Sequence, residues 1–138
     1  DADMAELMQT DFYPFMQNAD CPWVMTAHIK YNALDRENCV TQSAAALTFM
    51  RQRMQMTGLL LGDDLEMQAL EGDIPTRLQR ALDAGCDVAF WGGTDMYGKG
   101  AVAPDYAEKL QSLVDMAPKM RTDSIQRFAS CEVRPRML

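Results

Sequence analysis

The chain has 138 residues, 48% of them hydrophobic, and a formal net charge of −7. This length suits one domain with a packed core, so the composition excludes a disordered chain. The acidic balance argues against nucleic acid and against a membrane surface as partners, because phosphate groups and anionic lipids select basic proteins. No apolar run is long enough to span a membrane, and the acidic first residues do not resemble a signal peptide.

The cysteines point to a reducing compartment. Cys21, Cys39, Cys86 and Cys131 form no C-x-x-C pair, and the chain has one histidine, so the close spacing of a thiolate–imidazole zinc site is missing from the sequence. We therefore expect four reduced thiols in a cytoplasmic protein, with neither a metal nor another cofactor.

The spacing of apolar residues predicts helices and strands that alternate along the chain. Helices are expected over residues 3–19 (with a restart at Asp11), 41–54, 73–84, 104–116 and from 122 onward, and strands over 23–29, 59–62 and 87–91. The predicted helix N-caps are Asp3, Asp11, Thr41, Asp73 and Thr122, and Gly85 is the predicted end of the third helix. The apolar side chains expected to face a core include Phe12, Phe15, Met16, Tyr106, Leu110, Leu113, Val114, Ile125 and Phe128.

This order of elements predicts an α/β protein with a parallel sheet and right-handed crossovers. An eight-stranded barrel needs about 250 residues, and this chain has roughly half that length. The pattern therefore looks like the last three βα units of something larger, with parallel strands and the helices outside.

Two adjacent carboxylates mark the candidate site. The triplet Leu59–Leu61 predicts a fully buried strand, and it ends in Gly62, Asp63 and Asp64. Ligands of parallel sheets lie beyond the carboxyl ends of the strands, which is where Asp63 and Asp64 are expected. The spacing alone leaves two alternatives open, which are a helix N-cap and a divalent-cation cluster that would also include Glu66.

Three motifs in register resemble a known family. They are V-M-T-A-H over residues 24–28, G-L-L-L-G-D-D-L-E-M over 58–67, and A-L-D-A-G-C-D over 81–87. This sequence resembles the carboxyl-terminal part of a glycoside hydrolase family 3 barrel, of the bacterial β-N-acetylhexosaminidase (NagZ) type. The resemblance is strongest over 23–88 and weaker over the rest of 1–116. We assign the whole of 1–138 to one domain, with 117–138 outside the resemblance.

The resemblance implies a fold, an activity and site residues. It implies a partial (β/α)₈ TIM barrel of about the last three βα units, in which the three strands are the sixth, seventh and eighth. Asp63 becomes the nucleophile of a retaining hydrolysis through a covalent glycosyl-enzyme. The implied substrates are terminal β-N-acetylglucosaminyl residues from peptidoglycan recycling. Asp64 is implied as a hydrogen-bonding support for the loop and as a substrate-binding residue, and Met67 as packing near the sugar. His28 is either a structural residue or part of the sugar pocket.

The sequence also departs from the family pattern. Gly62 stands where the family has Ser or Thr, and nothing matches the family's K-H pair or its histidine–aspartate acid/base dyad. Catalysis would therefore need a missing N-terminal half that supplies the acid/base. The alternative is a non-catalytic, degenerate half-barrel that acts as an oligomeric or partner-binding module. In either case an open sheet edge predicts self-association or binding of a complementary half-barrel.

Overall fold

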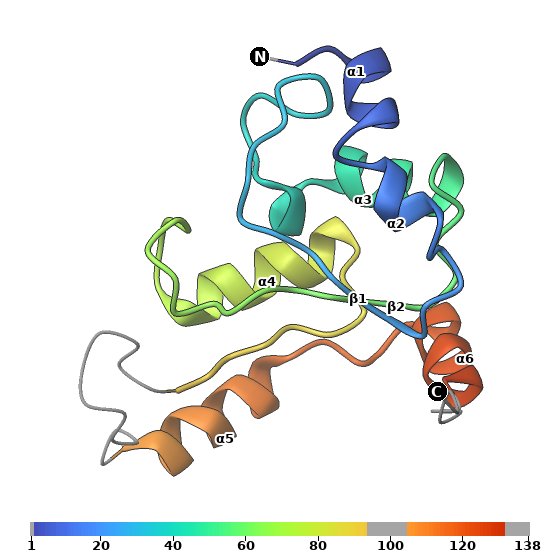
Figure 1. Ribbon diagram of the computed structural model, residues 1–138. Helices are drawn as coiled ribbons and strands as arrows, with labels where there is room; N and C mark the ends of the chain where they lie inside the picture. Colours follow the sequence, from blue (N-terminus) through green and yellow to red (C-terminus); the bar gives the residue numbers. More distant parts are fainter. Residues whose placement is uncertain (1, 94–104, 132–138) are drawn as a thin grey trace.

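The computed structural model describes residues 2–93 and 105–131, and it is an α/β structure (Figure 1). Its helices are α1 (Met4–Gln9), α2 (Tyr13–Met16), α3 (Ala44–Gln52), α4 (Ile74–Ala84), α5 (Tyr106–Met116) and α6 (Thr122–Ser130), and a 3₁₀ turn, η1 (Val40–Gln42), precedes α3. The strands β1 (Trp23–Met25) and β2 (Leu59–Leu61) pair in parallel. The predicted α/β class is therefore confirmed. Among the described residues, no helix is both long enough and apolar enough to cross a membrane.

The first predicted strand, 23–29, forms only over its first three residues, as β1. Beyond β1 the backbone leaves β2 and pairs with the η1 region through two hydrogen bonds, Thr41 N to Ala27 O (3.3 Å) and Val40 N to Ile29 O (2.9 Å). The strand ends early because these carbonyls take partners outside the sheet.

The third predicted strand, 87–91, is reduced to a single parallel bridge between Val88 and Leu61. The segment still runs beside β2, but the Leu60 amide donates to the Asp87 carboxylate (2.8 Å) and not to a backbone carbonyl. The side chain of Asp87 thus replaces one rung of the ladder. After the bridge, Gly62 N still donates to Val88 O (2.8 Å), but the Asp64 amide turns to Asp63 Oδ1, so regular pairing does not continue.

The two faces of the sheet differ in their surroundings. Val24 and Leu60 are buried in the main core, which α1, α3 and α4 share. Their neighbours Trp23 and Met25 point to the opposite face and are 43% and 50% exposed. Side chains alternate along a strand, so the apolar character of both sets indicates a sheet with two buried faces. On the second face the described residues bury Leu59, and Phe128 of α6 meets the ring of Trp23, but Trp23 and Met25 stay partly exposed.

Two predicted caps and one predicted helix end are confirmed. Asp3 Oδ1 accepts a hydrogen bond from Glu6 N (2.9 Å) at the start of α1, and Asp73 Oδ1 accepts one from Thr76 N (3.0 Å) at the start of α4. Gly85 ends α4 with φ of +123°, a conformation that other residues adopt at a cost.

The predicted cap at Thr41 is wrong. Thr41 lies in η1, fully buried, with its hydroxyl bonded to the side chains of Thr26 and His28. The cap of α3 is Ser43, whose Oγ accepts a hydrogen bond from Ala46 N (3.0 Å). A threonine already engaged in tertiary hydrogen bonds cannot serve the helix terminus, so α3 begins two residues later.

The predicted caps at Asp11 and Thr122 are also wrong. Asp11 accepts a hydrogen bond from the neighbouring Thr10 hydroxyl, and α2 begins after Phe12 without a side-chain cap. Thr122 is the first residue of α6, because the backbone is still extended at Arg121.

Several apolar side chains predicted to face a core are instead exposed. Phe12 and Leu113 are buried as predicted, and Met16 packs against the core. The exposed ones are Phe15, Leu110, Val114, Ile125 and Phe128. Their helices are amphipathic, and among the described residues these side chains stay largely uncovered, although Phe128 meets the ring of Trp23 edge-on.

Gly58 is required by a close approach of two segments. A Cβ atom at this position would overlap the carbonyl oxygens of Cys21 and Pro22, which are backbone atoms that cannot rotate away. The same approach lets Leu59 N donate to Pro22 O (2.9 Å). Gly58 therefore allows β2 to enter the sheet directly beside β1.

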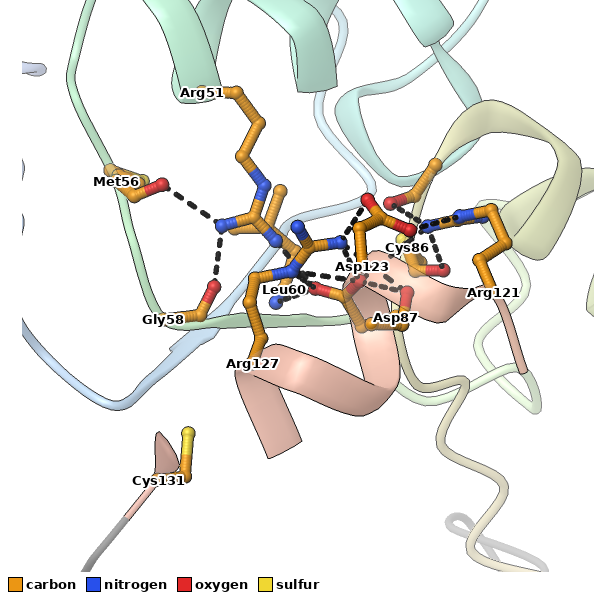
Figure 2. Close-up of polar contacts among 12 residues, drawn as sticks. Arg51, Met56, Gly58, Leu60, Cys86, Asp87, Arg121, Asp123, Arg127 and Cys131 are labelled. Carbon is orange, nitrogen blue, oxygen red and sulfur yellow. Dashed lines mark hydrogen bonds and ion pairs between the residues drawn. The ribbon is translucent and has the colours of Figure 1, made fainter. Parts of the chain in front are cut away.

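One buried carboxylate connects the elements at the amino end of the strands. Figure 2 shows the side chains of Arg51 from α3 and Arg127 from α6 converging on Asp87. The hydroxyl of Ser124, also from α6, donates to the same carboxylate. The Asp87 side chain is fully buried, and Arg127 Nη2 lies 2.6 Å from its Oδ1. Arg51 also donates to the carbonyls at Met56 and Gly58, just before β2. This set of contacts, the Asp87 cluster, holds α3, β2 and α6 together.

The Asp87 carboxylate stays ionised in this cluster. Burial alone would raise the pKa of Asp87, but the hydrogen bonds from Arg127, Ser124 and the Leu60 amide, with the Arg51 charge, together hold it below its usual value. Folding therefore favours the charged form of this side chain.

We predict that Asp87→Asn destabilises the chain by about 3 kcal/mol at pH 7, because two largely buried guanidinium groups lose their shared counter-charge. Because folding lowers the pKa of Asp87, this contribution is present above the unfolded carboxyl pKa of about 4 and is lost as the pH falls. Urea denaturation at several pH values measures it, with Asp83→Asn on the exposed face of α4 as the control. The prediction would be contradicted if the original chain and Asp87→Asn had the same free energy of unfolding at pH 7, or if the difference between them grew on acidification.

Candidate active site

β2 ends at the acidic pair, and the first carboxylate of that pair is partly accessible. Asp63 is partly exposed, and its Oδ1 accepts a hydrogen bond from the Asp64 amide (2.8 Å). Among the residues that the structure describes, its carboxylate has no further hydrogen-bond partner. A carboxylate that is fixed at one oxygen and open at the other is suited to attack an electrophilic carbon.

The second carboxylate is turned into the protein. Asp64 is 7% exposed, and its Oδ1 accepts hydrogen bonds from the amides of Glu66 (3.0 Å) and Gly92 (3.1 Å). The bond from Glu66 lies within the loop after β2, and the bond from Gly92 connects this loop with the loop after residues 87–91. The side chain of Asp64 therefore braces the loop that carries Asp63.

His28 lies beside this loop, and protein atoms engage both of its ring nitrogens. Nδ1 is 3.0 Å from the Thr41 hydroxyl, and Nε2 is 3.0 Å from the carbonyl oxygen of Asp64. Neither nitrogen is left for a direct hydrogen bond to a sugar. A role of His28 in the sugar pocket would have to use its ring carbons.

Met67 is partly buried one turn beyond the acidic pair. Its amide donates to the Asp64 carbonyl (3.1 Å), and its own carbonyl accepts from Arg77 Nη1 (3.2 Å). The same guanidinium nitrogen donates to the carbonyl of Leu65 (2.7 Å). The backbone from Asp64 to Met67 is thus held from both sides, while contact of the Met67 side chain with a sugar remains a prediction.

The backbone conformation at Gly62 does not require a glycine, but a side chain at this position would crowd Thr41. A Cβ atom at Gly62 would lie 3.3 Å from Cγ2 of Thr41, which is closer than most such contacts in proteins. A serine here would therefore press on the buried Thr41, which His28 contacts.

The acidic residues do not form a metal site. Glu66 Oε1 accepts a hydrogen bond from the indole of Trp91, and Asp64 Oδ1 is occupied by two amides. In the described part of the chain, no three potential ligand side chains lie together in a way that could hold a metal ion. The structure therefore does not favour the divalent-cation alternative.

Comparison of the sequence with known protein families identifies the family of this chain. The family description "Glycosyl hydrolase family 3 N terminal domain" matches residues 1–127. The chain belongs to glycoside hydrolase family 3.

Curated relatives agree with this assignment. The β-hexosaminidase of Bordetella pertussis is 32% identical over 130 residues, which cover 91% of this chain and 34% of the relative. That of Chromobacterium violaceum is 29% identical and covers all of this chain and 43% of the relative. The chain thus spans well under half the length of these relatives.

Solved structures share the fold. NagZ from Neisseria gonorrhoeae, in complex with N-trifluoroacetyl-D-glucosamine, matches 93% of this chain and 35% of its own chain, with a TM-score of 0.69 and 23% identity. The β-N-acetylglucosaminidase from Thermotoga maritima matches 92% of this chain and 28% of its own, with a TM-score of 0.64 and 26% identity. The arrangement of helices around the β1–β2 pair is therefore that of a family 3 N-terminal domain.

Three residues of the site were not identified from the sequence. The sequence predicts a helix cap at Thr41 and places Trp91 in the buried third strand. It gives Arg77 no role in the site, although Arg77 follows Ile74 by three residues and so shares the apolar face of α4, where a charged side chain requires a partner. That spacing was a usable signal, whereas the contacts of Thr41 and Trp91 depend on the tertiary fold.

We predict that replacing Asp64 lowers the stability of the fold much more than replacing its neighbour Asp63. Asp64→Ala removes the acceptor of two backbone amides and should destabilise the chain by about 2 kcal/mol. Asp63→Ala should change stability by less than about 0.5 kcal/mol, because its carboxylate supports little of the fold. Chemical denaturation of both variants measures the difference. Equal losses of stability would mean that Asp63, too, is a structural residue.

Proposed function

We propose that this chain carries the nucleophile of a retaining β-N-acetylhexosaminidase, and that the nucleophile is Asp63. The single observation behind this proposal is the contrast between the two carboxylates. Asp64 is buried and committed to backbone amides, whereas Asp63 is accessible at the carboxyl end of β2 and is held at one oxygen. A nucleophile needs such fixation without loss of access.

The proposed reaction has two steps. In the first, an Asp63 oxygen bonds to the anomeric carbon, and the leaving-group oxygen departs with a proton from a general acid. In the second, water gives its proton to the conjugate base, attacks the glycosyl ester from the opposite face and restores the Asp63 carboxylate. His28, the one histidine of the chain, has both nitrogens engaged, so we assign the acid/base to a complementary N-terminal half.

The proposed substrates are terminal β-N-acetylglucosaminyl residues from peptidoglycan recycling in the cytoplasm. The neighbour NagZ is in complex with an N-acylated glucosamine, which supports the sugar class. Free cysteines at all four positions agree with a reducing compartment. Asp64 and Met67 remain the proposed supports of the bound sugar.

We also propose that the fold is the last three βα units of a (β/α)₈ barrel. The parallel register of β1 and β2, the segment 87–91 beside β2, and the exposed apolar face at Trp23 and Met25 support this arrangement. The remaining strands would cover that face and pair with the free edge of β1. They would come from the complementary half or, less completely, from self-association.

A second candidate function is a non-catalytic, partner-binding half-barrel. Gly62 favours it, because a glycine directly before the nucleophile makes the backbone less rigid where catalysis needs rigidity. In this case the exposed apolar face would serve binding alone.

The decisive experiment is a chimera in which residues 1–127 replace the matching segment of the Chromobacterium violaceum β-hexosaminidase. We expect turnover of a nitrophenyl N-acetyl-β-glucosaminide, a loss of about 10³-fold or more in Asp63→Ala, and partial rescue of that variant by azide. Asp83→Asn removes an exposed carboxylate of α4 outside the site and is the control, so it should keep the activity of the chimera. Full activity of Asp63→Ala would contradict the proposed nucleophile, and a folded but inactive chimera would favour the binding module.

A further inference from the structure

We propose that His28 is a positioning residue, which holds the loop of Asp63 through one fixed neutral tautomer of its imidazole ring. Its significance for catalysis rests on the proposed function, but its geometry does not. A chain of hydrogen bonds runs from the buried side of the sheet to the backbone of Asp64.

The carbonyl oxygen of Asp64 determines the tautomer. It lies 3.0 Å from Nε2 of His28, and a carbonyl can only accept, so Nε2 carries the hydrogen. In the neutral ring Nδ1 is then an acceptor, and the hydroxyl of Thr41 at 3.0 Å is the donor. Each nitrogen of the ring therefore has one defined role.

A second threonine fixes the direction of the chain. The Thr41 and Thr26 hydroxyl oxygens are 2.8 Å apart, and Thr41 uses its hydrogen toward His28, so Thr26 donates to Thr41. Thr26 is 4% exposed and Thr41 is fully buried, so water does not compete for these groups. The hydrogen bonds run in one direction, from Thr26 through Thr41 and His28 to Asp64.

Asp64 transmits this constraint to Asp63. Its carbonyl accepts from His28 Nε2 and from Met67 N, and its carboxylate is held by two other amides. Its remaining polar group, the amide, donates to Asp63 Oδ1. The orientation of that amide, and with it the carboxylate of Asp63, depends on how firmly the Asp64 backbone is held.

Gly62 belongs to the same arrangement. The 3.3 Å between its built Cβ position and Thr41 Cγ2 indicates that the absent side chain leaves room for the Thr41 methyl group. The departure from the family's Ser or Thr at this position is thus linked to the residue that donates to Nδ1 of His28.

The test uses the whole chain, whose single histidine gives one unambiguous NMR signal. We expect long-range ¹H–¹⁵N spectra at a pH above the ordinary imidazole range to show hydrogen on Nε2. Thr41→Val removes the donor to Nδ1 with little change of shape, so the Nδ1 signal should shift while the hydrogen stays on Nε2, which the Asp64 carbonyl still holds. Thr48→Val, on the exposed side of α3, should leave the spectrum unchanged. Hydrogen on Nδ1 in the unaltered chain, or an unchanged Nδ1 signal in Thr41→Val, would overturn the proposal.

A second measurement follows the Asp64 amide and the Asp63 carboxyl carbon. Glutamine can donate to the Asp64 carbonyl and accept from Thr41, so His28→Gln should keep both signals near their original positions, whereas His28→Leu should shift them. Identical signals in a folded His28→Leu variant would contradict the positioning role. Neither NMR measurement requires turnover. A negative NMR result therefore leaves the assignment of Asp63 as nucleophile untouched, and an inactive chimera leaves the positioning role of His28 untouched.

Discussion

The buried ion cluster at Asp87 is the constraint on which the rest of this structure depends. A carboxylate without solvent contact would be costly, and here arginines from α3 and α6, a serine and a strand amide all bind it. Because Asp87 takes the amide of Leu60, it also determines where the segment 87–91 joins β2. The contacts that follow, from Gly62 N to Val88 O and from Leu65 N to Phe90 O, continue from that starting point to the site.

The two ends of the strands consequently have different tasks. Charged side chains at the amino end bind one another and stabilise the fold, as is usual for the stability face of parallel α/β structures. At the carboxyl end, the hydrogen bonds of Asp64, His28 and Arg77 fix the backbone and leave one carboxylate, Asp63, accessible. Preorganisation of this kind is the main protein contribution to reactions in which charge moves onto a bound group.

The sequence predicted the local features of the fold better than its tertiary ones. Asp3, Asp73 and Gly85 were predicted correctly, because caps and helix ends depend on neighbours three or four residues away. The role of Thr41 was predicted wrongly, because its hydroxyl binds residues 13 and 15 positions earlier in the chain. The motif around Asp63 pointed to the family from the residues alone, while the Asp87 cluster brings together arginines from positions 36 and 40 residues away and has no sequence pattern.

The most direct test of Asp63 is to locate the covalent intermediate in the active chimera. A fluorinated N-acetylglucosaminyl donor that forms the glycosyl ester faster than it is hydrolysed would trap it, and peptide mass mapping would find the modified residue. We predict one sugar, attached to Asp63 and absent from Asp64. A sugar attached to any other residue, or steady turnover of the donor by an enzyme that never accumulates an adduct, would contradict the assignment of Asp63 as the nucleophile.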